Sequence, residues 1–246
     1  RNRLKYHGAT VKAVEEPDFL STSDPWFRPV DVQLGPDGAL YVADFYNRII
    51  GHYEVPLDHP GRDRTSGRIW RITYSASDHA GRLHSQKRVS KYALPELIQE
   101  LGHPNQTRRM LIADYLSDTV GEAAISALYT AVENNSKPSI VAHAMWVLYR
   151  LKVTEQLDYQ KLMKHPSPLV RLHTLKVIHE MLSPPPVAIS SCEYLLNDED
   201  SFVQLAATEV LGRHGVSSIA LEELLLRKLE AIPLDDAILF HATRMS

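Results

Sequence analysis

Polar side chains that could bind a metal ion follow directly on a short apolar stretch, residues 39–43. Asp44 and Asn47 come next in the chain, and carboxylate and amide oxygens are the ligands that hard cations such as Ca²⁺ prefer. We therefore predict a metal site at Asp44 and Asn47, with Asn47 also available to a cofactor. The alternative is a turn in which the Asp and Asn side chains bond their own backbone.

A second group of polar residues lies a little further along the chain. Its members are His52, His59, Arg62, Asp63 and Arg64. A histidine could remove a hydroxyl proton as a general base, and an arginine could hold a carboxylate through two parallel hydrogen bonds. This predicts catalytic roles for His52 and His59 and cofactor-binding roles for Arg62 and Arg64. In the alternative, Arg62 and Asp63 form a surface ion pair that holds a long loop. The two histidines have no third ligand nearby, which argues against zinc.

Three short strands are expected to position these residues. Residues 30–34 alternate apolar and polar side chains, residues 35–38 read Gly-Pro-Asp-Gly, and residues 39–43 are apolar. This pattern predicts two strands joined by a tight turn. Residues 67–74 predict a third strand, with odd- and even-numbered side chains on opposite faces. Three such strands cannot bury both of their faces alone, so we predict one blade of a β-propeller.

Composition narrows the class of protein. The chain has 246 residues, of which 44% are hydrophobic, and no run of about 18 apolar residues predicts a membrane span. It begins at Arg1, inside a strand-rich region, so we expect it to be a piece of a longer protein. Cys192 is the only cysteine, which excludes an internal disulfide and a cysteine-based zinc site. It is expected to be a buried apolar residue. A c-type haem motif is absent.

Charge gives no support for nucleic-acid binding. Residues 1–92 hold 14 Lys/Arg and 11 Asp/Glu, a net charge of 14 − 11 = +3, and residues 93–246 hold 13 and 19, a net charge of 13 − 19 = −6. Neither part is basic enough for a nucleic-acid partner.

The hydrophobic period changes near residue 93. Leu94, Leu97, Ile98 and Leu101 have the spacing of one helix face. Helices are expected near residues 94–101, 106–117, 122–133, 138–151, 156–164, 168–182, 187–196, 200–213, 217–230 and 234–245. We expect five antiparallel pairs, with a rigid turn at the three consecutive prolines 184–186.

An internal repeat accompanies these helices. The turn-to-helix segments 103–109, 136–142, 165–171 and 198–204 resemble one another, and their last residues are separated by 33, 29 and 33 positions. Such a period predicts an α-solenoid. Arg109 and Arg171 occupy matching positions, either as a basic stripe on a concave surface or, as we favour, bonded to the acidic turn or the carbonyls of the next repeat. Trp146, Met145 and Tyr149 are expected in the core.

Residues 1–74 resemble the closing part of the propeller in a family of large predicted dehydrogenases of the soluble glucose/sorbosone-dehydrogenase type, found in planctomycetes, verrucomicrobia and related bacteria. The resemblance is carried by Asp24-Pro-Trp-Phe-Arg-Pro-Val-Asp, Gly35-Pro-Asp-Gly-Ala-Leu-Tyr-Val-Ala-Asp-Phe-Tyr-Asn, Ile50-Gly-His, Pro60-Gly-Arg-Asp-Arg and Gly67-Arg-Ile-Trp-Arg-Ile. In that family HEAT-like, armadillo-like repeats follow the propeller, and residues 93–246 are similar to them by pattern.

The resemblance implies a pyrroloquinoline-quinone (PQQ) sugar or alcohol dehydrogenase with Ca²⁺, exported from the cytoplasm. Its partners would be further propeller blades upstream and a cytochrome c domain downstream. This sequence lacks most of the propeller and the haem motif. Since a propeller site forms where several blades converge, one blade cannot supply it.

The expected architecture is a multidomain α+β chain. Residues 1–74 would form a partial β-propeller of about one blade, residues 75–92 a linker, and residues 93–246 an α-solenoid of HEAT-like helix pairs. Two functions remain open. In one, the chain is a fragment of the quinoprotein-like dehydrogenase, with the helices as an interaction scaffold. In the other, it is a non-catalytic module that binds a protein partner on the solenoid.

Overall fold

The computed structural model describes residues 1–49, 51, 54–74, 88–134, 137–215 and 218–246. Within these ranges the chain has two small sheets and a succession of helices, an α+β structure. It divides into two compact units. The helical unit comprises Arg1–Glu16, Ala93–Gly102 and Ile112–Ser246, and the sheet unit comprises Pro17–Tyr92 and His103–Leu111. No helix in the part that the structure describes is long and apolar enough to cross a membrane.

The sheet unit contains three antiparallel strands in the order β3-β4-β5. They are β3 (Pro29–Leu34), β4 (Leu40–Asp44) and β5 (Arg68–Ile72). All three strands lie where the alternation of side chains predicted them. The β3–β4 turn closes through the Gly35 N–H, which donates to the Ala39 carbonyl at 2.7 Å. Gly38 has φ +81°, a conformation that glycine adopts without strain.

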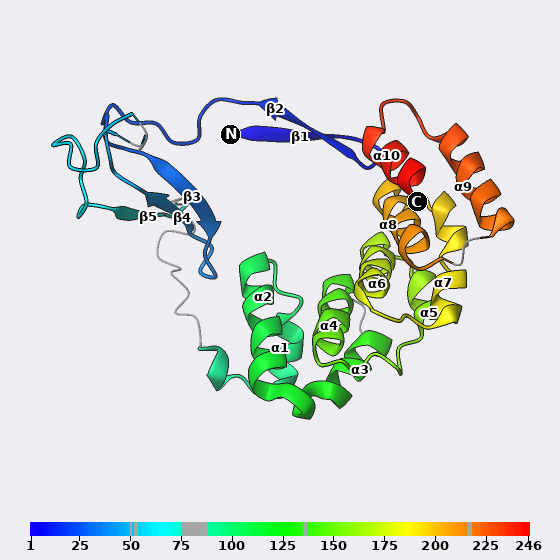
Figure 1. Cartoon of the computed structure of the whole chain (residues 1–246). Helices are drawn as coiled ribbons and strands as arrows, with labels where there is room; N and C mark the ends of the chain where they lie inside the picture. Colours follow the sequence, from blue (N-terminus) through cyan, green and yellow to red (C-terminus); the bar gives the residue numbers. More distant parts are fainter. Residues whose placement is uncertain (50, 52–53, 75–87, 135–136, 216–217) are drawn as a thin grey trace. The chain divides into compact units, whose positions relative to one another are not determined.

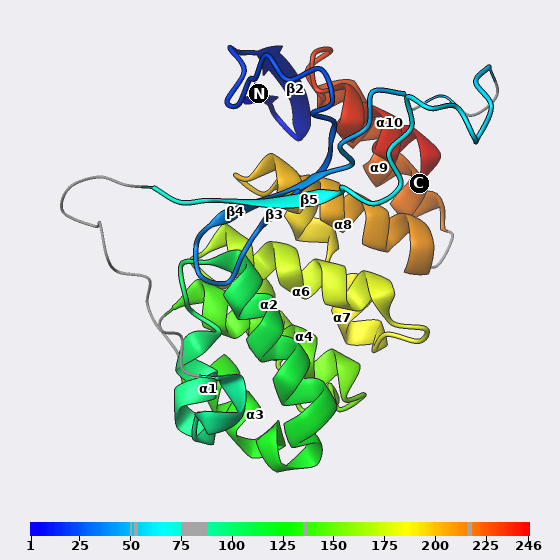
Figure 2. The same cartoon turned by 90° about the vertical axis from the view of Figure 1, so that its left-hand side faces the viewer.

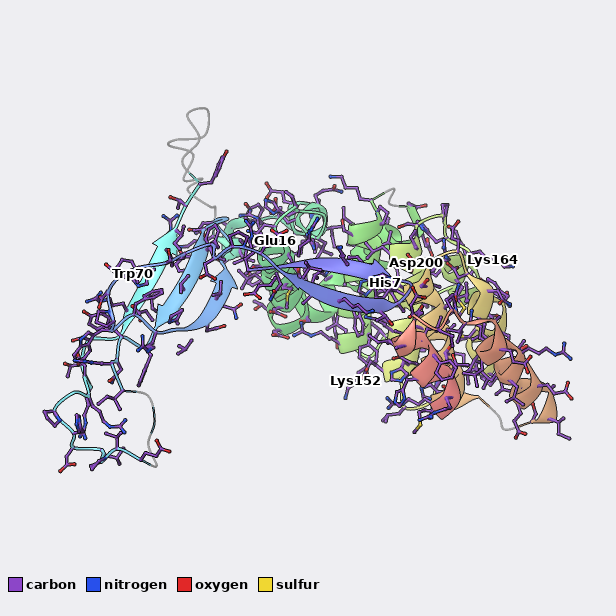
Figure 3. All side chains as sticks on the ribbon, turned by 90° about the horizontal axis from the view of Figure 1, so that it is seen from above. His7, Glu16, Trp70, Lys152, Lys164 and Asp200 are labelled. Carbon is purple, nitrogen blue, oxygen red and sulfur yellow. The ribbon has the colours of Figure 1, made fainter. Side chains whose placement is uncertain are left out.

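The register of β4 and β5 assigns the two faces of the sheet. Val42 lies opposite Trp70, and Asp44 lies opposite Arg68. Arg68, Trp70 and Ile72 therefore share one face, as the alternation predicted. This face is only partly covered, since 42% of Trp70 is exposed. Figure 3 labels Trp70 on β5. Whether the sheet is a propeller blade stays a prediction.

The first sixteen residues do not belong with the sheet, although we expected residues 1–74 to form one domain. β1 (Asn2–His7) and β2 (Thr10–Glu15) form an antiparallel hairpin, and this hairpin groups with the helices. Its turn contacts the C-terminal helices, and Figure 3 shows that end at His7 and the opposite end at Glu16. Residues 75–87 of the expected linker lie outside the described residues.

The helices follow the predicted order closely. They are α1 (Leu94–Glu100), α2 (Gln106–Tyr115), α3 (Ile125–Asn134), α4 (Pro138–Arg150), α5 (Tyr159–Met163), α6 (Pro168–Glu180), α7 (Pro186–Ser190), α8 (Ser201–His214), α9 (Ile219–Ala231) and α10 (Ala237–Met245). Their starts have local causes. Proline occupies the first turn of α4, α6 and α7, where its missing N–H costs nothing. The Asp200 side chain accepts the N–H groups of Phe202 and Val203 at the start of α8.

Several helices are shorter than expected, and α3 and α7 show what shortens them. α3 begins three residues later than predicted because residues 116–124 form irregular turns around Gly121, whose φ is +60°. α7 ends at Ser190, and a short 3₁₀ turn over Glu193–Asn197 replaces its second half. Cys192 lies between them with no exposed surface. Burial raises the pKa of its thiol to about 12. The prediction that Cys192 is buried is confirmed.

The core of the helical unit lies between successive helices. α4 packs on α3 and α6, α6 packs on α8, and α8 packs on α10, as Figures 1 and 2 show. Ile140, Met145, Leu148, Leu175 and Ile178 have no exposed surface. Each helix thus buries one stripe against its neighbours, which is how helical repeats are stabilised.

Candidate functional site

Asp44, predicted as a metal ligand, is buried and bonded to three N–H groups. Its Oδ1 accepts from the backbone N–H groups of Arg28 at 2.8 Å and Tyr46 at 2.9 Å, and its Oδ2 accepts from the Trp70 indole at 3.1 Å. Burial alone would raise the pKa of this carboxyl, but these hydrogen bonds and Arg68 nearby lower it below its usual value. The carboxylate therefore holds β3, β4 and β5 together at one end of the sheet.

The other residues of the predicted site hold the long loop. The Asn47 amide donates to the Asp63 carbonyl at 2.6 Å and its oxygen accepts the Ile49 N–H at 3.2 Å. Arg62 donates to the carbonyls of Pro56, Val55 and Gly51, Arg64 donates to the Leu57 carbonyl, and the His59 ring accepts the Gly61 N–H. The Asp63 carboxylate caps the N–H groups of Thr65 and Ser66. His52 lies outside the described residues.

This arrangement does not fit a Ca²⁺ or quinone site. The oxygens of Asp44 and Asn47 face N–H donors, and the guanidinium groups of Arg62 and Arg64 face backbone carbonyls. Among the residues that the structure describes, no group of three or more His, Cys, Asp or Glu side chains could hold a metal ion. The contacts favour the backbone-holding alternative for these residues. Their catalytic and cofactor roles remain untested predictions.

The repeat position in the helical array has a common hydrogen bond. Arg109 donates to the His103 carbonyl, Arg171 to the His165 carbonyl and Gln204 to the Asp198 carbonyl, at 2.8, 2.9 and 2.6 Å. In every case the acceptor lies six residues earlier, at the start of the turn. The three segments therefore repeat in structure as well as in sequence. The matching position in the fourth segment is Ala142, which has no side-chain donor.

Arg171 also joins two successive repeats. Its guanidinium forms two parallel bonds of 2.7 Å to the Asp198 carboxylate, and only 8% and 6% of the two side chains are exposed. Glu199 lies 3.3 Å away at the surface. The hydrogen bonds that Arg171 donates to the Asp198 carboxylate raise the pKa of Arg171. This confirms the preferred prediction for Arg171, whereas Arg109 donates to the carbonyls of its own turn, His103 and Pro104.

The surface of α4 carries three large side chains that the sequence did not mark as a site. Trp146, Tyr149 and Arg150 are partly exposed, whereas Met145 beside them is fully buried. Each of the three is fixed to a neighbouring helix. The Trp146 indole donates to His173 Nδ1 at 2.9 Å, the Tyr149 hydroxyl donates to the Glu180 carbonyl at 2.9 Å, and Arg150 bonds Asp114 and Asp118. The expectation that Trp146 and Tyr149 lie in the core is wrong for part of each side chain. Helical spacing predicts which face of α4 is buried, but it does not predict how far the buried area extends around the helix.

A groove of about 510 Å³ opens beside these side chains. Its walls come from the ends of α4 and α6 and from the segments that follow them. They are Tyr149, Arg150, Lys152, Thr154, Glu155, Tyr159, Met181, Leu182, Ser183 and Pro185. Leu182 is 94% exposed. Tyr159 is buried, and its hydroxyl donates to the Thr154 carbonyl at 3.1 Å. We call this feature the Tyr149 groove.

The Trp146–His173 bond predicts a pH dependence of stability. His173 Nδ1 accepts the hydrogen bond from the Trp146 indole N–H. This nitrogen therefore carries no proton, and the imidazole ring is neutral in the folded chain. Burial, and secondarily the charge of Lys176, lowers the pKa of His173 below 6.5. As pH falls, the unfolded chain therefore takes up a proton on His173 before the folded chain does. The contribution of the neutral ring to the free energy of unfolding is present above about pH 6.5 and is lost as pH falls below it.

We expect the melting temperature to fall between about pH 7.5 and about pH 5, and the fall to be smaller in His173→Gln. The glutamine retains an acceptor for Trp146 but does not titrate. Thermal unfolding followed by circular dichroism at both pH values measures the difference. An equal fall in both proteins would show that His173 does not contribute.

Comparisons with known proteins give few assignments. A family model described as a domain of unknown function, DUF7133, matches residues 1–76. No match is found among curated proteins. Among solved structures, a designed armadillo repeat protein in complex with the peptide (KR)4 is similar, with 17% sequence identity and a TM-score of 0.40. That alignment covers 62% of this chain and 79% of the designed protein.

Proposed function

We propose that this chain is a helical-repeat binding module and that a protein partner docks in the Tyr149 groove. The observation that carries the proposal is the arrangement on α4, where Trp146, Tyr149 and Arg150 lie together at the surface. Tryptophan, tyrosine and arginine are the side chains that contribute most to protein interfaces. Here each is held by a hydrogen bond or ion pair to another helix, so little side-chain entropy is lost on binding.

The chemistry of the groove favours an apolar anchor from the partner. Met181, Leu182 and Pro185 supply apolar lining. The Tyr149 ring also lines the groove, and its hydroxyl is already bonded to the Glu180 carbonyl.

Lys152 adds a positive charge to the lining, whereas the Arg150 guanidinium is already paired with Asp114 and Asp118. An aliphatic or aromatic side chain with a carboxylate near Lys152 matches this combination. The apolar side chain supplies affinity, and the charge of Lys152 orients the partner.

Two exposed leucines give a matched test of the groove. Leu182 lines it, Leu234 lies elsewhere in the helical unit, and both are 94% exposed. Immobilised full-length chain with Leu182→Asp is expected to retain a specific partner from native extract at least about tenfold less than the unaltered chain, because a charge then faces the apolar anchor. Leu234→Asp should retain it fully. Quantitative mass spectrometry measures the recovery. Equal recovery on both variants would reject the Tyr149 groove as the docking site.

A second candidate is the PQQ-linked sugar or alcohol dehydrogenase with an extracytoplasmic location. The half-exposed apolar face of β3-β4-β5 favours it, because a propeller blade covers such a face with the next blade. Dye-linked oxidation of a sugar, with added quinone and Ca²⁺, tests it in a longer form of the protein that carries further blades, because one blade cannot supply the site alone. Loss of that activity in Asp44→Ala or Arg62→Ala would support the assignment. Activity that survives in both variants would remove these residues from the site.

A further inference from the structure

Within the described residues, the outer edge of β5 has no paired strand. β5 pairs only with β4, and no backbone hydrogen bond from the described residues reaches its other side. In an antiparallel sheet every second residue of an edge strand turns its N–H and C=O away from its neighbour. The opposite edge is different, because the Leu34 carbonyl at the end of β3 accepts the Thr107 hydroxyl at 2.6 Å and the next carbonyl accepts the Asn105 amide at 2.8 Å.

A hollow of about 200 Å³ lies on the same face as Trp70, directly beside this edge. Leu20, Phe27, Trp70 and Ile72 form its apolar walls, with Thr22, Asp24 and Arg68 at the polar positions. Trp70 is held in place because its indole N–H is bonded to the buried Asp44 carboxylate at 3.1 Å. The hollow therefore exists before any partner binds, and it opens on the face of β5 that Arg68, Trp70 and Ile72 share.

Arg68 supplies an available charge on this face. Its guanidinium stacks 3.4 Å above the Tyr46 ring and lies 5.8 Å from the Trp70 ring. In the part of the chain that the structure describes, it makes no hydrogen bond or ion pair, and its charge acts at longer range on the buried Asp44 carboxylate. The stack orients its five donors without using them. By contrast, Arg71 on the other face is paired with Asp37 at 2.7 Å.

We propose that the edge of β5 binds an extended segment of another polypeptide as a fourth, antiparallel strand. The register of β5 sets the sequence of that segment. Positions opposite Ile72 and Trp70 must be apolar to fill the hollow, and the position opposite Arg68 must be acidic. Read from its N-terminus, the segment is apolar, any, apolar, any, acidic. Main-chain hydrogen bonds hold such a strand, and the side chains on one face select it.

Two peptides of equal composition test this register. The first is acetyl-Gly-Val-Thr-Val-Thr-Glu-Gly-amide, and the second, acetyl-Gly-Val-Thr-Val-Glu-Thr-Gly-amide, moves the acid to the opposite face. Fluorescence anisotropy of labelled peptides with the full chain measures the dissociation constants. We expect the first peptide to bind about fivefold more tightly, the effect of one well-placed cross-strand pair. Amide chemical shifts should change along β5.

Reversing the charges on Arg68 and on the peptide distinguishes specific strand pairing from nonspecific electrostatic attraction. Arg68→Glu should weaken the first peptide about fivefold, and replacing the peptide's Glu by Lys should restore the binding. Lys12→Glu reverses an exposed charge on β2 and should change nothing. Equal binding of both peptides, no binding of either, or shifts confined to the hollow without change along β5 would overturn the proposal. Self-association of the chain through β5, detected by sedimentation, would assign the edge to a second copy and overturn it as well.

Discussion

Replacing Arg171 by methionine is expected to lower the free energy of unfolding by about 3–5 kcal/mol. The substitution leaves the Asp198 carboxylate buried at 6% exposure without its cation. It also leaves the carbonyls of His165 and Pro166 without the guanidinium donor. Methionine fills most of the volume of the arginine stem, so the loss reports the uncompensated charge rather than a cavity.

The measurement is urea unfolding followed by circular dichroism, with Arg227→Met as the matched control. Arg227 also forms an ion pair, to Glu223 at 3.7 Å, but 79% of its side chain is exposed. Its replacement should cost less than about 0.5 kcal/mol. Adding Asp198→Asn to Arg171→Met should recover part of the loss, because the buried charge is then gone. A loss below about 1 kcal/mol for Arg171→Met would show that water or Glu199 compensates the carboxylate.

The repeat could be predicted from the sequence because its parts recur at a fixed spacing. Arg109 and Arg171 stand at the same place after matching His-Pro turns, and both bond the carbonyl six residues earlier. The partner of Arg171 also follows from the alignment, since Asp198 begins the next copy. Helix positions were predictable for the same reason. A buried stripe leaves a periodic mark that survives without knowledge of the neighbours.

The roles of the polar loop residues could not be predicted in this way. Asp44, Asn47 and Arg62 have the chemistry for a metal or carboxylate ligand, and the same chemistry binds backbone N–H and C=O groups. Which role they take depends on the path of the loop, and no local pattern records that path. Tyr149 shows the related problem for surfaces. Its spacing matches a core face, but its exposure depends on where α5 and α7 begin.

The contact between the two ends of the helical unit was also invisible in the sequence. The Ala9 N–H donates to Asp236 Oδ2 at 2.8 Å and the Thr10 hydroxyl donates to Oδ1 at 2.9 Å, across 227 and 226 residues. The Thr10 hydroxyl in turn accepts the Ile238 N–H at 2.9 Å. Residues so far apart in the chain leave no repeating pattern that would link them. An Asp that precedes a helix is already explained as its N-cap, so the sequence gives no reason to expect a second role for it. A strand-rich start, which the sequence did predict, implies no hairpin against the last helix.

Asp236→Ala is therefore expected to release the hairpin from the helices. Asp236 is 2% exposed, and it caps α10 as well as bonding Ala9 and Thr10. Its removal leaves buried donors unpaired, at a cost of about 2–3 kcal/mol. Hydrogen exchange of the amides in β1 and β2 should become about 30-fold faster or more, while the amides of α4 and α6 keep their protection.

Two further variants decide whether the carboxylate itself holds the hairpin. Asp235 is 63% exposed and lies 3.3 Å from His7, so Asp235→Ala changes the same charge and should accelerate exchange less than about twofold. Gly8→Ala leaves Asp236 in place but puts a Cβ 1.9 Å from its Oδ2 at φ +59°, and a methyl group cannot occupy that space. It should therefore release the hairpin as Asp236→Ala does. Unchanged protection of β1 and β2 in both Asp236→Ala and Gly8→Ala would mean that Tyr6 against Phe202 and the apolar contacts around Leu239 suffice to hold the hairpin. The buried carboxylate would then serve only as the cap of α10.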